Sequence, residues 1–159
     1  MSKVIEIGTG QMAMGDKETI ISTSGIGSCV FICLYEKVLR IGGAVHAMLP
    51  SRKHNKTTVF LAESEDNIGK YVDEAIIKLV DDLIKMGGSK DNMIAKVVGG
   101  SSMFKIFDNS KIGSDNVKSA EKILQLMKIQ IRNESVGGTN GRSASFNIGN
   151  GLVEVTIKM

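Results

Sequence analysis

The segment "CVFICLYEKVLRIGGAVHAML", Cys29 to Leu49, decides the fold because it holds two apolar runs separated by a short polar stretch. The first run, 29–36, is rich in β-branched and aromatic residues, and the second run, 40–49, has the same apolar character. Both features are typical of β-strands. Because the two runs are so close in the sequence, we expect them to pair as an antiparallel hairpin.

Outward from this hairpin, the sequence predicts two helices and six further strands. A long amphipathic helix is expected over Asn67 to Met86, where apolar residues recur at spacings of three and four and Gly87-Gly88 follows as a stop. A second helix should begin near Ser114 or Asp115 as its N-cap and carry one apolar stripe. The other strands are predicted at 3–8, 19–23, 93–98, 129–135, 142–148 and 152–158.

Both predicted helices need a sheet to cover their apolar faces. We therefore expect the α/β class: a single-domain α/β sandwich with a mixed β-sheet and two main helices, rather than a doubly wound repeat. The chain has 159 residues, of which 42% are hydrophobic. That size and composition suit one compact domain over residues 1–159 with a core of ordinary size.

The charge and hydropathy of the chain argue against two classes of protein. The net charge of +3 is spread over 20 basic and 17 acidic residues, and there are few aromatic side chains on which bases could stack. We therefore expect no nucleic-acid partner. No apolar run reaches the roughly 20 residues that cross a bilayer, and the N-terminus lacks the apolar region of a signal peptide. We expect a cytoplasmic protein that does not insert into a membrane.

Three glycine clusters invite comparison with known binding loops. Residues 10–17 have the two-glycine spacing of a P-loop but place Asp16 where the lysine belongs. Residues 8–13 fit a dinucleotide fingerprint, yet no helix pattern follows them. Residues 138–141 match the short loop of a KH module, but a strand pattern follows. We reject the first two, and for the later glycine clusters we favour turns between strands over a KH loop.

The two cysteines differ in their surroundings. On one strand Cys29 and Cys33 would lie about 13 Å apart, too far for a disulfide, so both should be free thiols. Cys33 lies in mid-strand and fits a small core residue. Cys29 instead follows a glycine bend that can leave the backbone amides of Gly27 and Ser28 unpaired. Cys29 is therefore either a nucleophile beside an oxyanion hole or another small core residue.

A nucleophilic cysteine needs a base, and the sequence offers only two histidines. His54 lies in the polar stretch "SRKHNK" and should be solvated. His46 lies in a predicted strand, where it is either the base or an ordinary core histidine. Pairing Cys29 with His46 in the hairpin would bring their Cβ atoms to about 4.5–5.5 Å. That register makes Lys37-Val38 a two-residue turn, which is poor turn chemistry, so a shifted register or a longer loop stays open.

A Cys/His pair can also bind metal, but this one lacks a recognisable ligand set. Two further ligands would have to come from Cys33, His54 or carboxylates, at no known zinc spacing. We therefore expect no metal ion and no cofactor. An imidazolium at His46 would lower the thiol pKa of Cys29, and Cys29 should then react with iodoacetamide even at mildly acidic pH.

Six short blocks follow one another along nearly the whole chain: "GIGSCV" (25–30), "HAMLP" (46–50), "YVDEA" (71–75), "GGSSMF" (99–104), "IGSDN" (112–116) and "GGTNGR" (137–142). Together they resemble the pattern of the chemoreceptor glutamine deamidases known as CheD. Each block alone is a weak signal, but six in the same order and spacing are specific. Two positions depart from the pattern: Thr139 stands where asparagine is usual, and Glu36-Lys37 replaces Asp-Pro.

The resemblance implies an α/β sandwich related to the deamidating cytotoxic necrotizing factor toxins, with catalytic Cys29, His46 and Thr23. Thr23 would orient the imidazole; otherwise it is a simple strand residue. The implied reaction is hydrolysis of glutamine side chains on methyl-accepting chemotaxis receptors to glutamate through a thioester. The alternative implied role is a regulatory module that binds and stimulates the phosphatase CheC.

Three segments are expected to border the substrate site, because loops positioned by a sheet usually carry recognition. They are the long polar segment Ser51 to Asp66, the turn at Gly99-Gly100, and the turn at Gly137 to Arg142.

Overall fold

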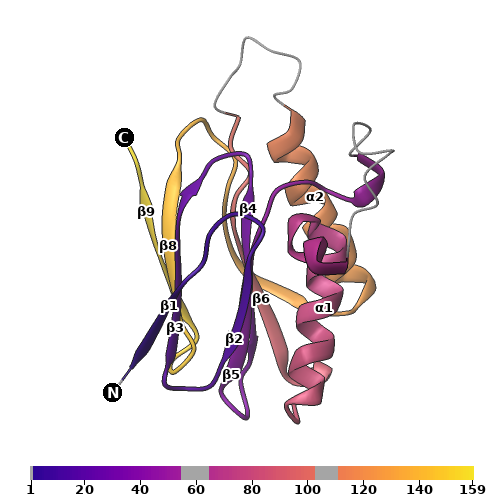
Figure 1. The fold of residues 1–159 in the computed structure, drawn as a ribbon, viewed down its shortest axis with the longest axis vertical. Helices are drawn as coiled ribbons and strands as arrows, with labels where there is room; N and C mark the ends of the chain where they lie inside the picture. Colours follow the sequence, from indigo (N-terminus) through magenta and orange to yellow (C-terminus); the bar gives the residue numbers. More distant parts are fainter. Residues whose placement is uncertain (1, 55–64, 103–110) are drawn as a thin grey trace.

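The computed structural model describes residues 2–54, 65–102 and 111–159, and this part of the chain folds into three layers (Figure 1). A four-stranded sheet has the order β1-β3-β8-β9, and a five-stranded sheet has the order β2-β5-β4-β6-β7. Helices α1 and α2 cover the face of the five-stranded sheet that points away from the other sheet (Figure 1). The strands are β1 (Lys3–Glu6), β2 (Met12–Gly15), β3 (Thr19–Ile26), β4 (Val30–Glu36), β5 (Ile41–Ala47), β6 (Met93–Gly99), β7 (Gln130–Val136), β8 (Arg142–Asn147) and β9 (Leu152–Ile157).

The predicted hairpin of β4 and β5 forms the centre of the molecule. β5 is buried at every position and β4 at all but one, because each lies between two apolar layers. Val30, Ile32 and Leu34 belong to the core under the helices. Phe31 and Cys33 point the other way, into the core between the two sheets. This alternation gives the fold two separate hydrophobic layers.

Both predicted helices are present, but both begin at other residues than predicted, α1 at Val72 instead of Asn67 and α2 at Lys111 instead of after Ser114 or Asp115. α1 spans Val72–Lys85 and follows a 3-10 segment at Glu65–Lys70, and its apolar stripe lies in the core. α2 spans Lys111–Leu126, so Ser114 and Asp115 lie inside the helix instead of capping it. Gly113, in the first turn of α2, lies directly against the segment after β6: a Cβ at this position would collide with the backbone oxygens of Gly100 and Ser101. The glycine permits close packing and does not mark a boundary.

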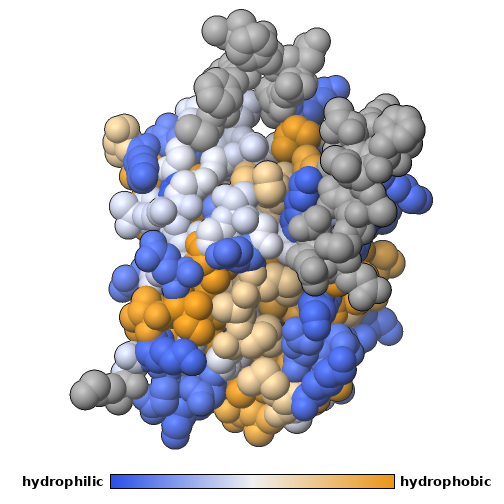
Figure 2. Space-filling view, viewed as in Figure 1, coloured by the Kyte–Doolittle hydropathy of each residue, from blue (hydrophilic) through white to orange (hydrophobic). Residues whose placement is uncertain are grey.

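The predicted α/β sandwich is confirmed, with its strands divided between two mixed sheets. β1 pairs with β3 and β6 pairs with β7 in parallel, and the remaining pairs are antiparallel. Strand β2, which the sequence analysis did not predict, adds to the edge of the five-stranded sheet beside β5. It is short and half-buried, and Figure 2 shows apolar surface over the middle of the face on which β2 lies.

The register of the hairpin differs by two residues from the pairing of Cys29 with His46. Phe31 is the residue opposite His46, and Val30 is opposite Ala47. The connection has four residues, 37–40, and ends at Arg40 with φ 56°. Buried Glu36 stabilises this longer loop, because its side chain accepts hydrogen bonds from the backbone N–H groups of Val38, Leu39 and Ser89 at 2.7, 3.2 and 3.2 Å. A shift of two residues keeps every side chain on the same face of the sheet.

Most of the predicted loop Ser51 to Asp66 lies outside the described residues. Arg52–His54 at its start forms a 3-10 turn. The side chain of His54 is not among those that the structure describes, so its predicted solvation stays a prediction. None of the helices in the described ranges is both long and apolar enough to cross a lipid bilayer.

Candidate active site

Thr23 and His46 meet in the layer between the two sheets. Thr23 lies on β3 of the four-stranded sheet, and His46 lies on β5 of the five-stranded sheet. Both side chains are buried, and Thr23 Oγ1 lies 2.8 Å from His46 Nδ1. The two residues that the resemblance paired are therefore in direct contact.

The hydrogen bonds of the Thr23 hydroxyl determine the tautomer of His46. Thr23 Oγ1 donates its only hydrogen to the backbone carbonyl of Ile7 at 2.8 Å. The hydroxyl must then accept at its contact with His46, so Nδ1 carries the imidazole hydrogen. The lone pair is consequently on Nε2, which is buried and has no hydrogen-bond partner among the described residues. A neutral Nε2 in this state is available as a base.

The loop between β1 and β2 holds the histidine from its other side. Gly10 N donates to the carbonyl of His46 at 2.6 Å, and His46 N donates to the carbonyl of Gln11 at 3.1 Å. The Gln11 side chain in turn accepts from Gly8 N at 2.7 Å. Sequence analysis tested this glycine-rich loop only as a phosphate-binding motif and missed its role. Its real partner is a strand more than thirty positions further on, which no local pattern reveals.

Cys29 closes a bend at Gly27, Ser28 and Cys29 whose three carbonyls are all hydrogen-bonded. The N–H of Ser28 shares a peptide with the carbonyl of Gly27, and the N–H of Cys29 shares one with the carbonyl of Ser28. In a trans peptide the N–H and C=O point in opposite directions. Both N–H groups therefore point away from the donors that bind these carbonyls. The amide of Cys29 lies close enough to its own thiol to favour the thiolate. The carbonyl contacts are Ser101 N to Gly27 O at 2.9 Å, Asn116 Nδ2 to Ser28 O at 2.9 Å, and Gly100 N to Cys29 O at 2.8 Å.

Of the turns expected beside the site, the one at Gly99-Gly100 contacts this bend directly, and the one at Gly137 to Arg142 is connected to it through Ser101. Gly99 has φ 115°, and a Cβ there would collide with the carbonyl oxygen of Cys29. The hydroxyl of buried Ser101 lies 3.0 Å from Gly27 O and 2.8 Å from the carbonyl of Asn140. The segment after β6 thus joins the cysteine bend to the loop before β8. Sequence analysis did not single out Ser101, because its contacts lie about 40 and 74 positions away.

Cys33 is a core residue, as predicted. It is buried in the layer between the sheets, and burial raises the pKa of its thiol well above the ordinary value. Both cysteines are free thiols, and Cys29 is the more exposed of the two. The structure therefore separates one accessible thiol on a bend from one inaccessible thiol within the sandwich.

The expected ion pair between Cys29 and His46 is not supported. Partial burial raises the pKa of the Cys29 thiol, although the Cys29 N–H partly opposes that shift. Burial also lowers the pKa of His46. Both shifts favour the neutral forms, and no hydrogen bond joins the thiol to Nε2. The direction of the Cys29 shift is opposite to the expected low thiol pKa, because that expectation considered the partner charge and left out the loss of solvation.

A raised thiol pKa makes a testable prediction about chemical labelling. In the folded protein Cys29 should react with iodoacetamide more slowly at neutral pH than in the unfolded chain, and its rate should rise only in the alkaline range. Peptide mapping across a pH series measures this rate, with Cys33 as the buried comparison. Rapid labelling of Cys29 at mildly acidic pH would contradict the raised pKa and support an ion pair between Cys29 and His46.

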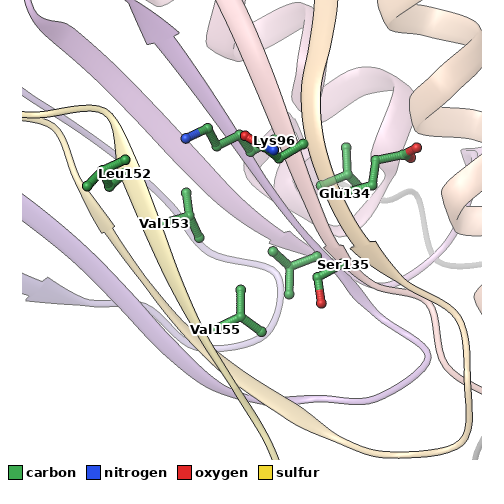
Figure 3. Close-up of a pocket in the computed structure, with 9 residues that line it drawn as sticks. Lys96, Glu134, Ser135, Leu152, Val153 and Val155 are labelled. Atoms are coloured by element: carbon green, nitrogen blue, oxygen red, sulfur yellow. The ribbon is translucent and has the colours of Figure 1, made fainter.

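Two further kinds of site, a metal site and a pocket, were considered in the described part of the chain. Within the described ranges, no three His, Cys, Asp or Glu side chains gather closely enough to hold a metal ion. A hollow of about 330 Å³ lies at the opposite edge of the sandwich, where side chains of β6, β7 and β9 surround it (Figure 3). Its lining includes Lys96, Glu134 and Val153 but none of Thr23, Cys29 and His46.

Comparison with known proteins gives a consistent family. A family model described as CheD chemotactic sensory transduction matches residues 48–157. A probable chemoreceptor glutamine deamidase CheD from Pyrococcus abyssi is 37% identical over 157 residues, covering 98% of this chain and 92% of the relative. The chemoreceptor glutamine deamidase CheD from Thermotoga maritima is 38% identical over 155 residues, covering 98% and 91%. On this evidence the chain belongs to the CheD family.

Proposed function

We propose that this protein hydrolyses glutamine side chains of chemoreceptors to glutamate, with Cys29 as nucleophile, His46 as base and Thr23 as the residue that orients the base. The names of the relatives support the reaction. The observation that supports the assignment of residues is the 2.8 Å contact between Thr23 Oγ1 and His46 Nδ1, because it leaves the lone pair on Nε2, which is buried and has no partner within the described ranges.

In the first half of the reaction, Cys29 Sγ attacks the carboxamide carbon of glutamine while Nε2 of His46 takes the thiol proton. The carbonyl π pair moves onto oxygen, and the backbone amides of Ser28 and Cys29 stabilise the resulting oxyanion. Nε2–H then gives its proton to the departing nitrogen, the C–N bond breaks, and ammonia leaves. The product of this half is a thioester between Cys29 and the side chain.

In the second half, water replaces ammonia. Nε2 removes a proton from water, and the hydroxide attacks the thioester carbon, which forms a second oxyanion at the same amides. Collapse of this intermediate breaks the C–S bond, and the proton on Nε2 returns to Sγ. Glutamate is released with the thiol restored. Because both groups start and end neutral, the raised pKa of Cys29 and the lowered pKa of His46 agree with a base that acts during attack.

Thr23 is expected to be less important than the base that it orients. Thr23→Val removes the hydroxyl at nearly constant volume and leaves the Ile7 carbonyl and Nδ1 unpaired, at a cost of about 1–3 kcal/mol of stability. Turnover should fall by less than about 10²-fold, because general base catalysis as a whole contributes about 10²–10⁴-fold. Thr23→Ser, which keeps the hydroxyl, should retain most of the activity. Steady-state kinetics with a folded variant test this, and equal turnover in Val and Ser variants would remove the role.

The substrate should be a glutamine presented on a folded receptor. Remote contacts supply part of the energy that supports a chemical step, and the turns at 99–102 and 137–141 lie where they could contact the surface around the target. Free glutamine lacks that surrounding surface and should be a very poor substrate.

The proposed function is tested by incubating the protein with a cytoplasmic receptor fragment and locating converted glutamines by mass spectrometry. Site-selective conversion is expected, with negligible release of ammonia from free glutamine in a parallel assay. A fragment that stays unchanged would refute the proposal. Efficient hydrolysis of free glutamine alone would instead indicate a small-molecule glutaminase.

A further inference from the structure

Asn116 on α2 ties together the two segments that carry Cys29 and His46. Its side chain is fully buried, and Nδ2 donates to the carbonyl of Ser28 and to the carbonyl of Met48, each at 2.9 Å. Ser28 immediately precedes Cys29, and Met48 is the second residue after His46. One amide group thus spans the two sides of the candidate site.

The bond to Ser28 also sets the direction of a peptide plane. The carbonyl of Ser28 and the N–H of Cys29 belong to the same trans peptide, so holding the carbonyl toward α2 holds the N–H on the opposite side. A rotation of this peptide would turn the carbonyl toward the substrate and remove a donor from the oxyanion. Asparagine can prevent this because its amide supplies two N–H donors, which aspartate lacks.

The other half of the same side chain, Oδ1, is buried and has no partner among the residues that the structure describes. A buried acceptor without a partner is costly, and such groups tend to persist where function requires them.

The helix that carries Asn116 is itself seated firmly against the bend. Gly113, one turn earlier, allows α2 to pack directly on the backbone of Gly100 and Ser101. Those two residues donate to the carbonyls of Cys29 and Gly27. α2 and the segment after β6 thus form one support that restrains three successive carbonyls.

We propose that Asn116 is a positioning residue that orients the Ser28–Cys29 peptide so that the N–H of Cys29 faces the oxyanion. This inference rests on the proposed deamidase function. It predicts a defect in catalysis that is separate from the reactivity of the thiol. Alkylation by iodoacetamide displaces iodide and forms no oxyanion, so it reports the access and ionisation of Cys29 alone.

The experiment compares Asn116→Ala and Asn116→Asp with the wild type in both reactions. Asn116→Asp keeps the side-chain volume and removes the donors, so it covers the case in which Asn116→Ala does not fold. For both variants kcat on the receptor fragment should fall by about 10²–10³-fold, the usual effect of losing one oxyanion donor. KM and the alkylation rate of Cys29 at alkaline pH should stay within about twofold.

Ser119→Ala provides a matched control on the same helix. Ser119 Oγ donates to the carbonyl of Pro50 at 2.8 Å, which is another bond from α2 to the segment after β5. This bond does not involve the cysteine bend, so kcat should remain that of the wild type. An equal loss in Ser119→Ala would show that any weakening of this helix contact reduces activity, which would overturn the specific role of Asn116.

Three other results would also overturn the inference. Asn116 variants with wild-type kcat would show that the peptide needs no such restraint. A parallel fall of kcat and alkylation rate, or failure of both variants to fold, would assign Asn116 to structural stability alone. Absence of turnover in the wild type is a distinct outcome, because it would remove the proposed function together with this inference.

Discussion

Cys29→Ala should abolish conversion of receptor glutamine to glutamate, whereas Cys33→Ala should retain most of it. Cys29 is the accessible thiol and lies on a bend with backbone amides directed away from its supports. Cys33 is buried between the sheets with a strongly raised pKa, so it cannot reach a substrate as a thiolate. Loss of the nucleophile should reduce kcat by more than about 10⁴-fold. Mass spectrometry of the receptor fragment after timed incubation measures the conversion.

The comparison between the two cysteine variants separates chemistry from folding. Cys33→Ala removes a buried sulfur and should lower stability by about 1 kcal/mol, the typical effect of one substitution, without changing the site. Thermal unfolding establishes that both variants are folded. Comparable loss of activity in two folded variants, or retained turnover in Cys29→Ala, would remove Cys29 as the nucleophile.

His46→Ala should be nearly as damaging as Cys29→Ala, because the proposed mechanism uses Nε2 of His46 as the base for the thiol. His46→Gln is the better-matched variant, since it keeps a polar side chain of similar size and can still donate to Thr23, but has no basic nitrogen. The double variant Cys29→Ala/His46→Ala should be little worse than either single one, because residues that act as a unit are not additive. Rapid turnover by folded His46→Gln would exclude the base role.

The activity of the wild type should also fall at acidic pH, and the pKa of His46 determines where it falls. Protonated Nε2 cannot accept the thiol proton, so kcat/KM should fall as the pH falls through the pKa of His46. Burial lowers that pKa, so the fall should lie below the ordinary range for histidine. The same shift predicts that folding stability decreases as the pH falls from the ordinary pKa of histidine to the lowered pKa of His46, because the unfolded chain binds the proton more readily. His46→Gln should lack this contribution in thermal unfolding measured across the series.

Much of the architecture could be predicted because it depends on local pattern. Apolar runs with strand character identified β4 and β5, and spacings of three and four identified α1. The hairpin register could not be predicted in this way. It depends on Glu36, which binds its own loop but also Ser89, more than fifty positions away. Division of the strands between two sheets likewise depends on packing across the whole chain.

The candidate site was predictable to a similar degree. Cys29 stood out through the glycine bend and His46 through its strand, whereas the role of Thr23 came only from the family resemblance. Asn116 and Ser101 were missed as site residues because their hydrogen bonds span long stretches of sequence. Ile7 was missed for the same reason, since its carbonyl is a backbone group that carries no side-chain signature.

The bond between Thr23 and His46 crosses from one sheet to the other, so the orientation of the imidazole depends on how the two sheets are docked. A partly unfolded form could keep both sheets and both helices yet separate the sheets, and the histidine would then lose the group that selects its tautomer. In the proposed mechanism, catalysis therefore requires the native state in which the two sheets are docked. It should appear last on refolding, after most secondary structure has formed, and an early intermediate would be inert toward receptors.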